Sequence, residues 1–337
     1  MITDVHVHHV PNAFAQFVEK AAAYGIHRDA PRGESVGLHV KQLDFALTRT
    51  FFDPERLLAR MAQMRVDRAV LSLATPFVNF DVPASLGVET AELYNNEIAS
   101  LRKAIPDRFN AWAYLPMQDP NAAAKELRRA VAALGASGGY LPSNVNGRYL
   151  DDGDFTPIFA TAAELGVPLM IHPSNPPARE RMSKYELAVV AGYLFDTTLN
   201  IFNMIFGGLF DRFPGLKVYC THLGGYAPLL HMRMQRELDT NPSLVARLKK
   251  PLQEYLQSIY FDTICFDPAY AYAAIQSGTV VRSHLVLGSD TPFPLGEPDP
   301  VGFVERSFGS QEPALAERLL HRNASDLLTP RKSGAGR

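Results

Sequence analysis

Residues 2–8 read Ile-Thr-Asp-Val-His-Val-His, an alternation that is typical of a β-strand. Successive side chains of a strand point to opposite faces, so His6 and His8 project from one face while Val5 and Val7 pack on the other. Two imidazoles one strand repeat apart are able to hold one metal ion. His-x-His also arises by chance, and a strand-end histidine is more often an ordinary half-buried side chain. The interpretation therefore depends on finding further ligands.

Beyond this segment, strand-like apolar runs alternate with amphipathic stretches, which indicates a parallel sheet with crossover helices. Eight runs are predicted as strands. They are residues 2–8, 69–74, 110–115, 138–145, 167–171, 216–221, 260–266 and 284–287. Eight repeats in 337 residues predict an α/β protein with one (β/α)8, or TIM, barrel over residues 1–330.

Three regions depart from the plain barrel pattern. Residues 10–52 contain prolines and glycines without a clean helix-then-strand pattern. We interpret them as an insertion after the first strand, with space for a small hairpin, that forms a cap over the barrel mouth. Residues 184–213 form a long, mostly apolar helical stretch, which a subunit interface would explain. Residues 331–337 are small and polar and are expected to be a disordered tail.

Composition argues against several classes of function. The net charge of -2 provides no basic field for nucleic acid and no polybasic membrane patch. No signal peptide is expected, and apolar runs such as residues 187–195 are too short to span a bilayer. Cys220 and Cys265 lie in apolar, strand-like segments, which indicates buried thiols rather than a disulfide. We therefore expect a cytoplasmic protein.

Three more metal-competent side chains close predicted strands. His172 follows the fifth strand, His222 the sixth and Asp290 the eighth, each directly before turn residues. Active sites of such barrels form at the C-terminal ends of the strands. Each residue alone has an ordinary explanation as a strand-end side chain or a turn or helix cap, but chance does not readily account for the whole set. Three histidines and one carboxylate suit zinc or a similar divalent ion.

This constellation resembles the amidohydrolase superfamily, and within it the branch of 2-amino-3-carboxymuconate-6-semialdehyde decarboxylase and related non-oxidative decarboxylases. By this resemblance His6, His8, His172 and Asp290 bind one zinc ion, with manganese or iron as alternatives. His222 is then the catalytic acid/base beside the metal. The segments that carry the resemblance, of which the last two are the most specific, are residues 52–54, 115–118, 181–185, 207–218 and 288–297.

The resemblance also implies substrate contacts and a homodimer. Arg49 in the insertion matches the family's substrate-carboxylate arginine, and Arg233 matches one that reaches the neighbouring subunit's pocket. Both have the alternative of being surface arginines. Phe293, within the 288–297 segment, is the third predicted substrate contact. Ser174 and Glu186 stand where the decarboxylase has tryptophans, so the wall of the pocket and the substrate are expected to differ.

The leading hypothesis is a zinc-dependent decarboxylase of a small anionic aromatic or ring-opened substrate, with zinc-bound water and a histidine acid/base. The second hypothesis is a zinc-dependent hydrolase that cleaves a carbon–carbon, lactone or amide bond of a related intermediate of aromatic catabolism. The third is a degenerate barrel that only binds a ligand or partner. Residues 139–145, at the fourth strand, contain no Lys, Asp or Glu to bridge two ions, so one metal ion per chain is predicted.

Overall fold

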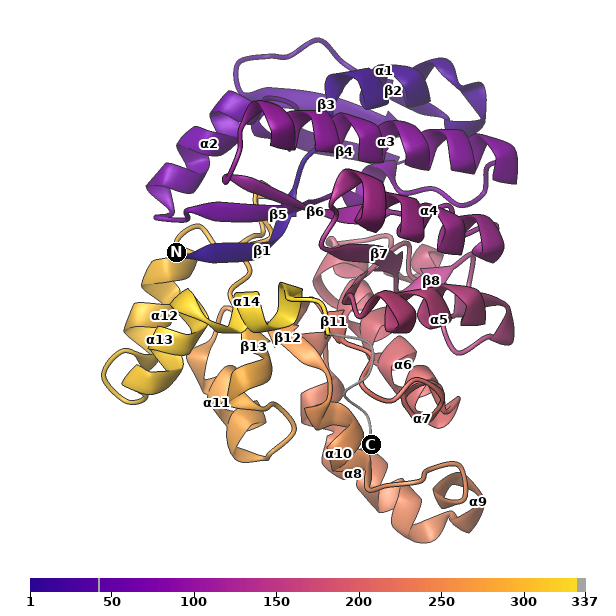
Figure 1. Ribbon diagram of the computed structural model, residues 1–337, viewed down its shortest axis with the longest axis vertical. Helices are drawn as coiled ribbons and strands as arrows, with labels where there is room; N and C mark the ends of the chain where they lie inside the picture. Colours follow the sequence, from indigo (N-terminus) through magenta and orange to yellow (C-terminus); the bar gives the residue numbers. More distant parts are fainter. Residues whose placement is uncertain (42, 332–337) are drawn as a thin grey trace.

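The computed structural model describes residues 1–41 and 43–331, in which eight parallel strands form a nearly closed barrel (Figure 1). The chain closes the barrel between its last and first strands, because Val5 N donates to Leu287 O at 3.0 Å and Asp290 N to His6 O at 2.9 Å. The predicted TIM-like barrel is confirmed. In order around the sheet, the strands are β1 (Thr3–His8), β5 (Arg68–Ser72), β6 (Phe109–Tyr114), β7 (Gly138–Pro142), β10 (Leu169–His172), β11 (Val218–Cys220), β12 (Tyr260–Asp262) and β13 (Leu285–Val286).

Helices pack around the outside of the barrel (Figure 1). The helix over Pro120–Leu134 is capped at both ends: the Asp119 carboxylate accepts from Asn121 N at 3.1 Å and Ala122 N at 3.0 Å, and Gly135 ends it with a φ of 69°. The helices are α2 (Pro54–Gln63), α3 (Ala84–Ala104), α4 (Pro120–Leu134), α5 (Thr156–Leu165), α6 (Tyr193–Phe206), α7 (Leu209–Arg212), α8 (Ala227–Thr240), α9 (Pro242–Val245), α10 (Leu252–Gln257), α11 (Pro268–Gln276), α12 (Pro300–Phe308), α13 (Pro313–His321) and α14 (Asn323–Leu328). A two-stranded ribbon, β8 (Asn144–Val145) with β9 (Arg148–Tyr149), follows β7.

Large aromatic side chains fill the inside of the barrel. Trp112 and Tyr219 are buried with their rings 5.9 Å apart. The polar atom of each ring forms a hydrogen bond: the Trp112 indole donates to Val5 O at 2.9 Å, and the Tyr219 hydroxyl donates to Asp262 at 2.8 Å. Because buried polar atoms without partners are costly, these bonds fix the rings. These rings therefore give the barrel strands a rigid core.

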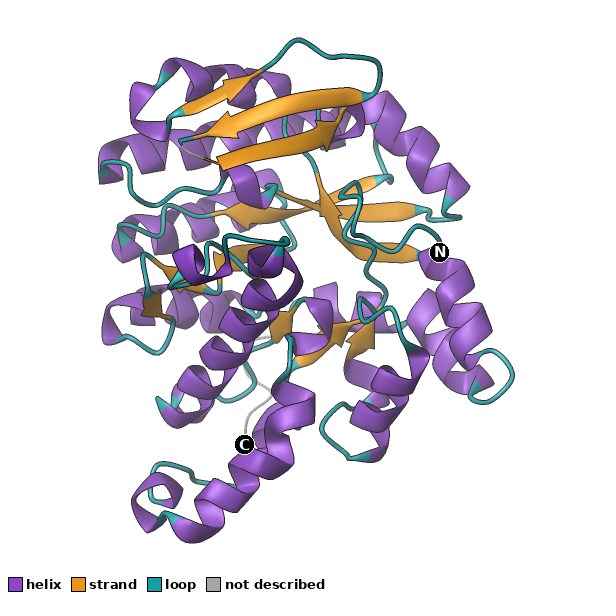
Figure 2. Ribbon diagram, turned by 180° about the vertical axis from the view of Figure 1, so that it is seen from behind, coloured by secondary structure: helices purple, strands orange, loops and turns teal. Residues whose placement is uncertain are grey.

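The insertion after β1 combines a helix with an antiparallel sheet (Figure 2). The helix α1 (Asn12–Lys20) precedes the strands β2 (Ile26–Arg28), β3 (Ser35–Val40) and β4 (Leu43–Thr48), which pair in that order. The sequence analysis expected no clean helix here and so missed α1. That helix is only 9 residues long and has no side-chain hydrogen bond at its N-cap, so its sequence carries few start signals. The segment beyond β4 returns to the barrel, where Phe51 O accepts from Val10 N at 2.8 Å.

The apolar stretch predicted as helical from residue 184 becomes helical only at Ala188. Tyr185 and Glu186 have φ values of 59° and 55°, which a right-handed helix excludes. A π-helical turn then leads into α6, and together they span Ala188–Phe206, 19 residues with a mean hydropathy of 1.3. By length and composition this helix is long enough to cross a membrane, which corrects the earlier estimate from residues 187–195. Half of it is nevertheless buried inside the protein, as in the core helix of a globular fold.

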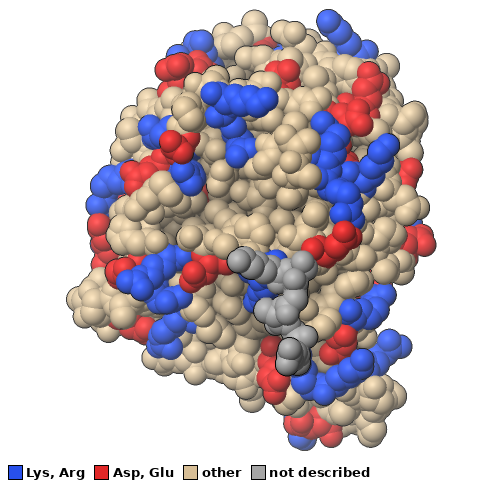
Figure 3. All heavy atoms as spheres, viewed as in Figure 1, with Lys and Arg blue, Asp and Glu red and all other residues tan. Residues whose placement is uncertain are grey.

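The N-terminal ends of the strands are closed by the last helices. Lys217, just before β11, donates its Nζ to the carbonyl oxygens of Asp326 and Thr329, both at 2.7 Å, which ties α14 across the barrel (Figure 1). Arg331, placed in the predicted tail, donates its backbone N–H to the loop before β10 at 2.9 Å. Residues 332–337 lie outside the described residues. Figure 3, viewed from this end, shows Lys and Arg interspersed with Asp and Glu over the surface.

Candidate metal centre

Four predicted residues meet at the C-terminal ends of the barrel strands. His6 and His8 lie on β1, His172 ends β10 and Asp290 follows β13, and their ligand atoms all lie within 4.8 Å of one another. All four side chains are buried. The rings of the three histidines are 4.9 to 5.1 Å apart, centroid to centroid. The alternation of β1 thus places His6 and His8 on one face, as predicted.

Each of the three histidines has its Nδ1 next to a protein acceptor. A neutral imidazole carries one N–H, and a carbonyl or carboxylate oxygen can only accept. We therefore assign all three rings the tautomer protonated at Nδ1, which leaves a lone pair on each Nε2. The pairs are His6 Nδ1–Asp262 Oδ2 (2.9 Å), His8 Nδ1–Leu73 O (3.3 Å) and His172 Nδ1–Pro173 O (2.9 Å).

The Nε2 lone pairs converge on the Asp290 carboxylate. Among the described residues, Nε2 of His6 and of His172 is buried without a hydrogen-bond partner. Nε2 of His6 lies 3.2 Å and Nε2 of His8 lies 2.9 Å from Asp290 Oδ1. Acceptors at such distances repel one another unless a proton or a cation lies between them. Three imidazole nitrogens and one carboxylate therefore fit a divalent cation.

The charges of the cluster favour a cation at the same point. Burial lowers the pKa of His6, but the charge of Asp290 and the hydrogen bonds to Asp262 and Asp290 outweigh burial and raise that pKa to about 10. Without a metal ion, His6 therefore holds a second proton on Nε2, at the position that a cation would take. Burial and the neighbouring imidazoles hold the pKa of His172 well below its ordinary value. Burial raises the pKa of Asp290, but the charge of His6 and a hydrogen bond from His222 bring it well below its ordinary value. An ionised Asp290 and a neutral His172 are the forms that bind metal.

His222 lies beside the cluster without belonging to the set of four ligands. Its ring centroid is 5.0 Å from that of His6 and 5.4 Å from that of His172. Its Nε2 lies 3.5 Å from Asp290 Oδ2, farther from that carboxylate than Nε2 of His6 and of His8, and its Nδ1 lies 3.0 Å from Thr221 Oγ1. The Thr221 hydroxyl either donates or accepts, so its contact with Nδ1 does not fix the tautomer of His222, whereas the carboxylate next to Nε2 can only accept. A residue that gains and loses a proton requires this freedom.

The backbone that carries His222 is left-handed over four consecutive residues. The φ values are 54° at His222, 51° at Leu223, 72° at Gly224 and 65° at Gly225. For residues other than glycine this conformation costs about 1–3 kcal/mol and persists only where the surroundings enforce it. A Cβ at Gly225 would lie 2.2 Å from Leu194 O, so the turn is also pressed against the neighbouring helix. The fold thus maintains a strained turn at the end of β11.

The three predicted substrate contacts are placed differently. The Phe293 ring lies 5.1 Å from the His8 ring and 4.8 Å from the Phe51 ring, so it lies beside the metal centre. Arg49 begins the 3-10 turn that ends at Phe51, and no hydrogen bond or ion pair joins its guanidinium to the part of the chain that the structure describes. Arg233 is exposed on α8, and within residues 1–41 and 43–331 no hydrogen bond joins it to the metal centre.

The sequence analysis missed the residues that orient the ligands. Asp262 binds His6, the Ser72 hydroxyl lies 3.0 Å from His8 Nδ1, and the Thr75 hydroxyl lies 3.1 Å from His172 Nδ1. Asp262 carried a usable signal, because it is a carboxylate at the end of an apolar run, as the other site residues are. Ser72 and Thr75 carried none, since hydroxyl residues commonly follow strands without a role in any site.

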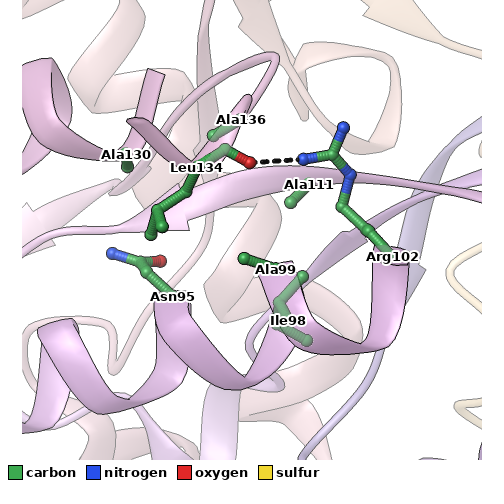
Figure 4. A pocket seen from close by; sticks show the side chains of 8 residues that line it. All are labelled: Asn95, Ile98, Ala99, Arg102, Ala111, Ala130, Leu134 and Ala136. Carbon is green, nitrogen blue, oxygen red and sulfur yellow. Dashed lines mark hydrogen bonds between the residues drawn. The ribbon is translucent and has the colours of Figure 1, made fainter. Parts of the chain in front are cut away.

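Two hollows lie away from the metal centre. One, of about 10 Å³, lies between α3 and α4, where Arg102 Nη1 donates to Leu134 O at 2.7 Å (Figure 4). It has space for about one water molecule. The other is a groove of about 650 Å³ near Met1, Arg65 and Asp67, at the N-terminal ends of the strands. Neither is lined by any predicted site residue.

The barrel and its centre of three histidines and one aspartate define a divalent-metal site on a TIM-like fold. The chain belongs to the amidohydrolase family, whose model matches residues 3–329. The 2-amino-3-carboxymuconate-6-semialdehyde decarboxylase of Dictyostelium discoideum is 31% identical over 334 residues, which cover 96% of this chain and 90% of that protein. The predicted family is therefore confirmed.

Solved structures of other proteins share the fold. The IDCase of Metarhizium anisopliae superimposes with a TM-score of 0.85 at 23% identity, covering 97% of each chain. A 5-carboxyvanillate decarboxylase from Novosphingobium aromaticivorans, solved with manganese and 3-methoxy-4-hydroxy-5-nitrobenzoic acid, superimposes with a TM-score of 0.81 at 21% identity, covering 97% of each chain. These likenesses confirm the architecture of the whole barrel, including the insertion.

Proposed function

We propose that this protein is a metal-dependent non-oxidative decarboxylase of a small aromatic carboxylate or of a ring-opened product of one. The observation that carries the proposal is the convergence of three histidine Nε2 atoms on Asp290, with the uncommitted imidazole of His222 beside them. The full-length relative from Dictyostelium is a decarboxylase, and the Novosphingobium relative holds an aromatic acid. Both support this choice of reaction and substrate class.

In the proposed reaction His222 supplies the proton. The imidazolium protonates the carbon that bears the carboxylate, the carbon–carbon bond breaks, and its electron pair remains with the product while carbon dioxide leaves. His222 is then neutral and regains its proton from solvent. Asp290, 3.5 Å from His222 Nε2, orients the ring toward the metal centre. A divalent ion bound by the four ligands supplies a Lewis acid for the oxygens of the substrate.

We propose one divalent ion per chain, and zinc as that ion. Three imidazole nitrogens with one carboxylate are a common zinc set. Manganese is the competing ion, because the Novosphingobium relative binds it. The strand β7 contains no Lys, Asp or Glu that bridges a second ion. Elemental analysis of the purified protein tests both the number and the identity of the ions.

Release of carbon dioxide tests the reaction itself. The protein is loaded with zinc or manganese and incubated with a panel of hydroxylated benzoic acids and ring-opened dicarboxylates. We expect one carbon dioxide per molecule of acid consumed, and none after removal of the metal by a chelator. Consumption of lactone, amide or carbon–carbon substrates without carbon dioxide would instead identify a hydrolase. Full metal occupancy without turnover of any of these compounds would favour a barrel that only binds ligands.

Arg49→Ala is expected to weaken use of a carboxylate substrate. Arg49 lies in the turn that contacts Phe293, and no described residue forms an ion pair with its guanidinium, so its fork is available for a carboxylate. Loss of the guanidinium should lower kcat/KM by an amount that corresponds to about 2–4 kcal/mol of transition-state stabilisation. The reason is that the substrate carboxylate loses the cation that pairs with it. Steady-state kinetics measure the loss, and the metal content should not change.

Two further variants decide whether the guanidinium itself matters. Arg49→Lys should restore little activity, because lysine cannot supply the planar fork. Arg56→Ala is the matched control: Arg56 lies in the same region but already pairs with Glu34. Its kcat/KM should equal that of the wild type. Unchanged kinetics in Arg49→Ala would leave the insertion without a role in substrate recognition.

We also propose a homodimer formed through an exposed apolar surface. The segment before α6, α6 itself and α8 expose large apolar side chains, and α6 packs against α8. Exposed apolar surface marks interaction sites. Arg233 lies on the same helix, which would bring it to the partner subunit. The side chains of this dimer surface, with their exposed fractions, are Tyr185 (85%), Leu187 (42%), Val190 (52%), Phe195 (52%), Leu229 (56%) and Met232 (65%).

Met232→Asp should shift the protein toward monomers. A charge on the dimer surface loses hydration when the two surfaces meet, which opposes association. Light scattering at micromolar concentration measures the mass. Leu43→Asp is the control, because Leu43 is an exposed apolar residue of the insertion, away from the dimer surface. A monomeric wild type would contradict the proposal and remove the role of Arg233 at a neighbouring site.

We propose a cytoplasmic location. Cys220 is buried and Cys265 is partly buried, and both are unpaired, as predicted. Free thiols persist in reducing compartments, which supports the assignment. Fractionation of the source cells tests it.

A further inference from the structure

Asp262, the last residue of β12, is buried and accepts four hydrogen bonds. Its Oδ2 accepts from His6 Nδ1 at 2.9 Å and from the Tyr219 hydroxyl at 2.8 Å. Its Oδ1 accepts from the backbone N–H of Leu223 and of Ile264, both at 3.1 Å. A carboxylate offers about four lone-pair positions, so Asp262 is fully engaged. One partner, His6, belongs to the metal centre, and another, Leu223, belongs to the turn that carries His222.

We propose that Asp262 is the positioning residue that couples the metal ligand His6 to the turn of His222. One oxygen sets the tautomer of His6, and the other holds the amide directly after His222. The part that concerns His6 rests on the metal centre alone. The part that concerns His222 rests on the proposed function, in which His222 supplies the proton.

The first part of the coupling is the tautomer of His6. With Asp262 Oδ2 as acceptor, the proton of the neutral ring stays on Nδ1 and the lone pair of Nε2 faces the other ligands. If Nδ1 faced a donor instead, the ring would carry its proton on Nε2, where it would exclude a metal ion. Such supporting partners of metal-binding histidines typically change metal affinity by about 10-fold to 100-fold.

The second part is the strained turn. Leu223 has a φ of 51° and a ψ of 26°, and it stands directly after His222. The turn closes on itself through Gly224 N–Thr221 O and Gly225 N–His222 O, both at 2.9 Å, but these bonds are local. The Leu223–Asp262 bond connects the turn to the next strand of the barrel. It therefore fixes the turn, and with it His222, relative to the metal ligands.

Two substitutions separate the two parts. Asp262→Asn keeps an oxygen for the amides of Leu223 and Ile264 but turns an NH2 donor toward His6 Nδ1. Asp262→Ala removes every acceptor. We expect the zinc dissociation constant, measured by competition with a chelator, to rise at least about tenfold in both variants. We expect amide hydrogen exchange at Leu223 to be unchanged in Asp262→Asn and at least about tenfold faster in Asp262→Ala.

Asp4→Asn is the matched control. Asp4 is equally buried, and it accepts from the backbone N–H of His6 at 3.0 Å and of Ser289 at 3.1 Å, but it forms no hydrogen bond to an imidazole of the described residues. Its zinc affinity should stay within about threefold of the wild type. If Asp4→Asn lost as much zinc affinity as the Asp262 variants, any substitution of a buried carboxylate would disturb the site. That result would overturn the specific role of Asp262.

Each outcome decides one part of the proposal. Wild-type zinc affinity in Asp262→Asn overturns the tautomer role, and unchanged Leu223 exchange in Asp262→Ala overturns the turn role. Asp262→Leu, which has nearly the shape of aspartate, replaces the alanine variant if that variant does not fold. A Leu223 amide that exchanges at the rate of an unprotected amide in the wild type also overturns the turn role. Neither readout uses a substrate, so failure of the proposed decarboxylation is distinguishable from failure of this inference.

Discussion

Asp290→Ala is expected to abolish metal binding and turnover together. Asp290 is the one anion of the four ligands, and its Oδ1 lies 3.2 Å from His6 Nε2 and 2.9 Å from His8 Nε2. Without it, three buried neutral imidazoles would have to hold a doubly charged ion that has lost its hydration. Elemental analysis after desalting should give less than about a tenth of an ion per chain, compared with about one in the wild type.

The result has to be separated from general destabilisation. Asp119→Ala is a suitable control, because that carboxylate caps α4 and, among the described residues, forms no hydrogen bond to a metal ligand. It should cost about 1 kcal/mol of unfolding free energy while leaving metal content and turnover unchanged. Retention of a full complement of metal in Asp290→Ala would remove Asp290 from the ligand set. Two ions per wild-type chain would also contradict the proposed single-ion site.

The ligands were predictable because strand ends in a barrel are close in space although distant in sequence. His6 and His8 share a face by the period of a strand, and His172 and Asp290 each follow an apolar run. The positions of these side chains could therefore be predicted without knowing how the loops fold. Asp262 obeys the same rule and was overlooked only because the seventh predicted run was extended past it.

Other features depend on contacts that the sequence does not display. Leu223 adopts a left-handed conformation that local preference disfavours, and the bond to Asp262 from a neighbouring strand is long-range. The start of the helix at Ala188 is set by left-handed residues at Tyr185 and Glu186, which hydrophobicity does not reveal. Tertiary contacts thus override local signals at the turn and at the helix start.

Ser174 stands where the resemblance leads us to expect a tryptophan in the related decarboxylase. Its hydroxyl donates to Asn144 O at 3.1 Å, and its backbone N–H donates to Ser143 Oγ at 3.1 Å, so this side chain is buried in the wall beside His172. A tryptophan there would need the space that this hydrogen-bonded network occupies. The network therefore supports the expectation that the wall of the pocket differs.

His222→Asn is expected to keep its metal and lose most of its activity. The four ligands do not include His222, whose Nε2 lies 3.5 Å from Asp290 Oδ2. Asparagine tolerates left-handed backbone better than most residues, so the turn with a φ of 54° should survive the change. Asparagine cannot transfer a proton near neutral pH, and the loss of an acid/base is worth about 10²-fold to 10⁴-fold in rate.

Three measurements decide the role of His222. Elemental analysis should find the wild-type metal content, steady-state kinetics should show the loss in kcat, and the limb of the pH–rate profile that is due to an imidazole should disappear. His231→Asn is the matched control, since His231 lies on α8 with its Nδ1 2.7 Å from Pro228 O and should leave all three unchanged. Loss of metal in His222→Asn would make His222 a ligand. Retention of both metal and full activity would mean that another group moves the proton, and decarboxylation and hydrolysis at this centre would both then require a different acid/base.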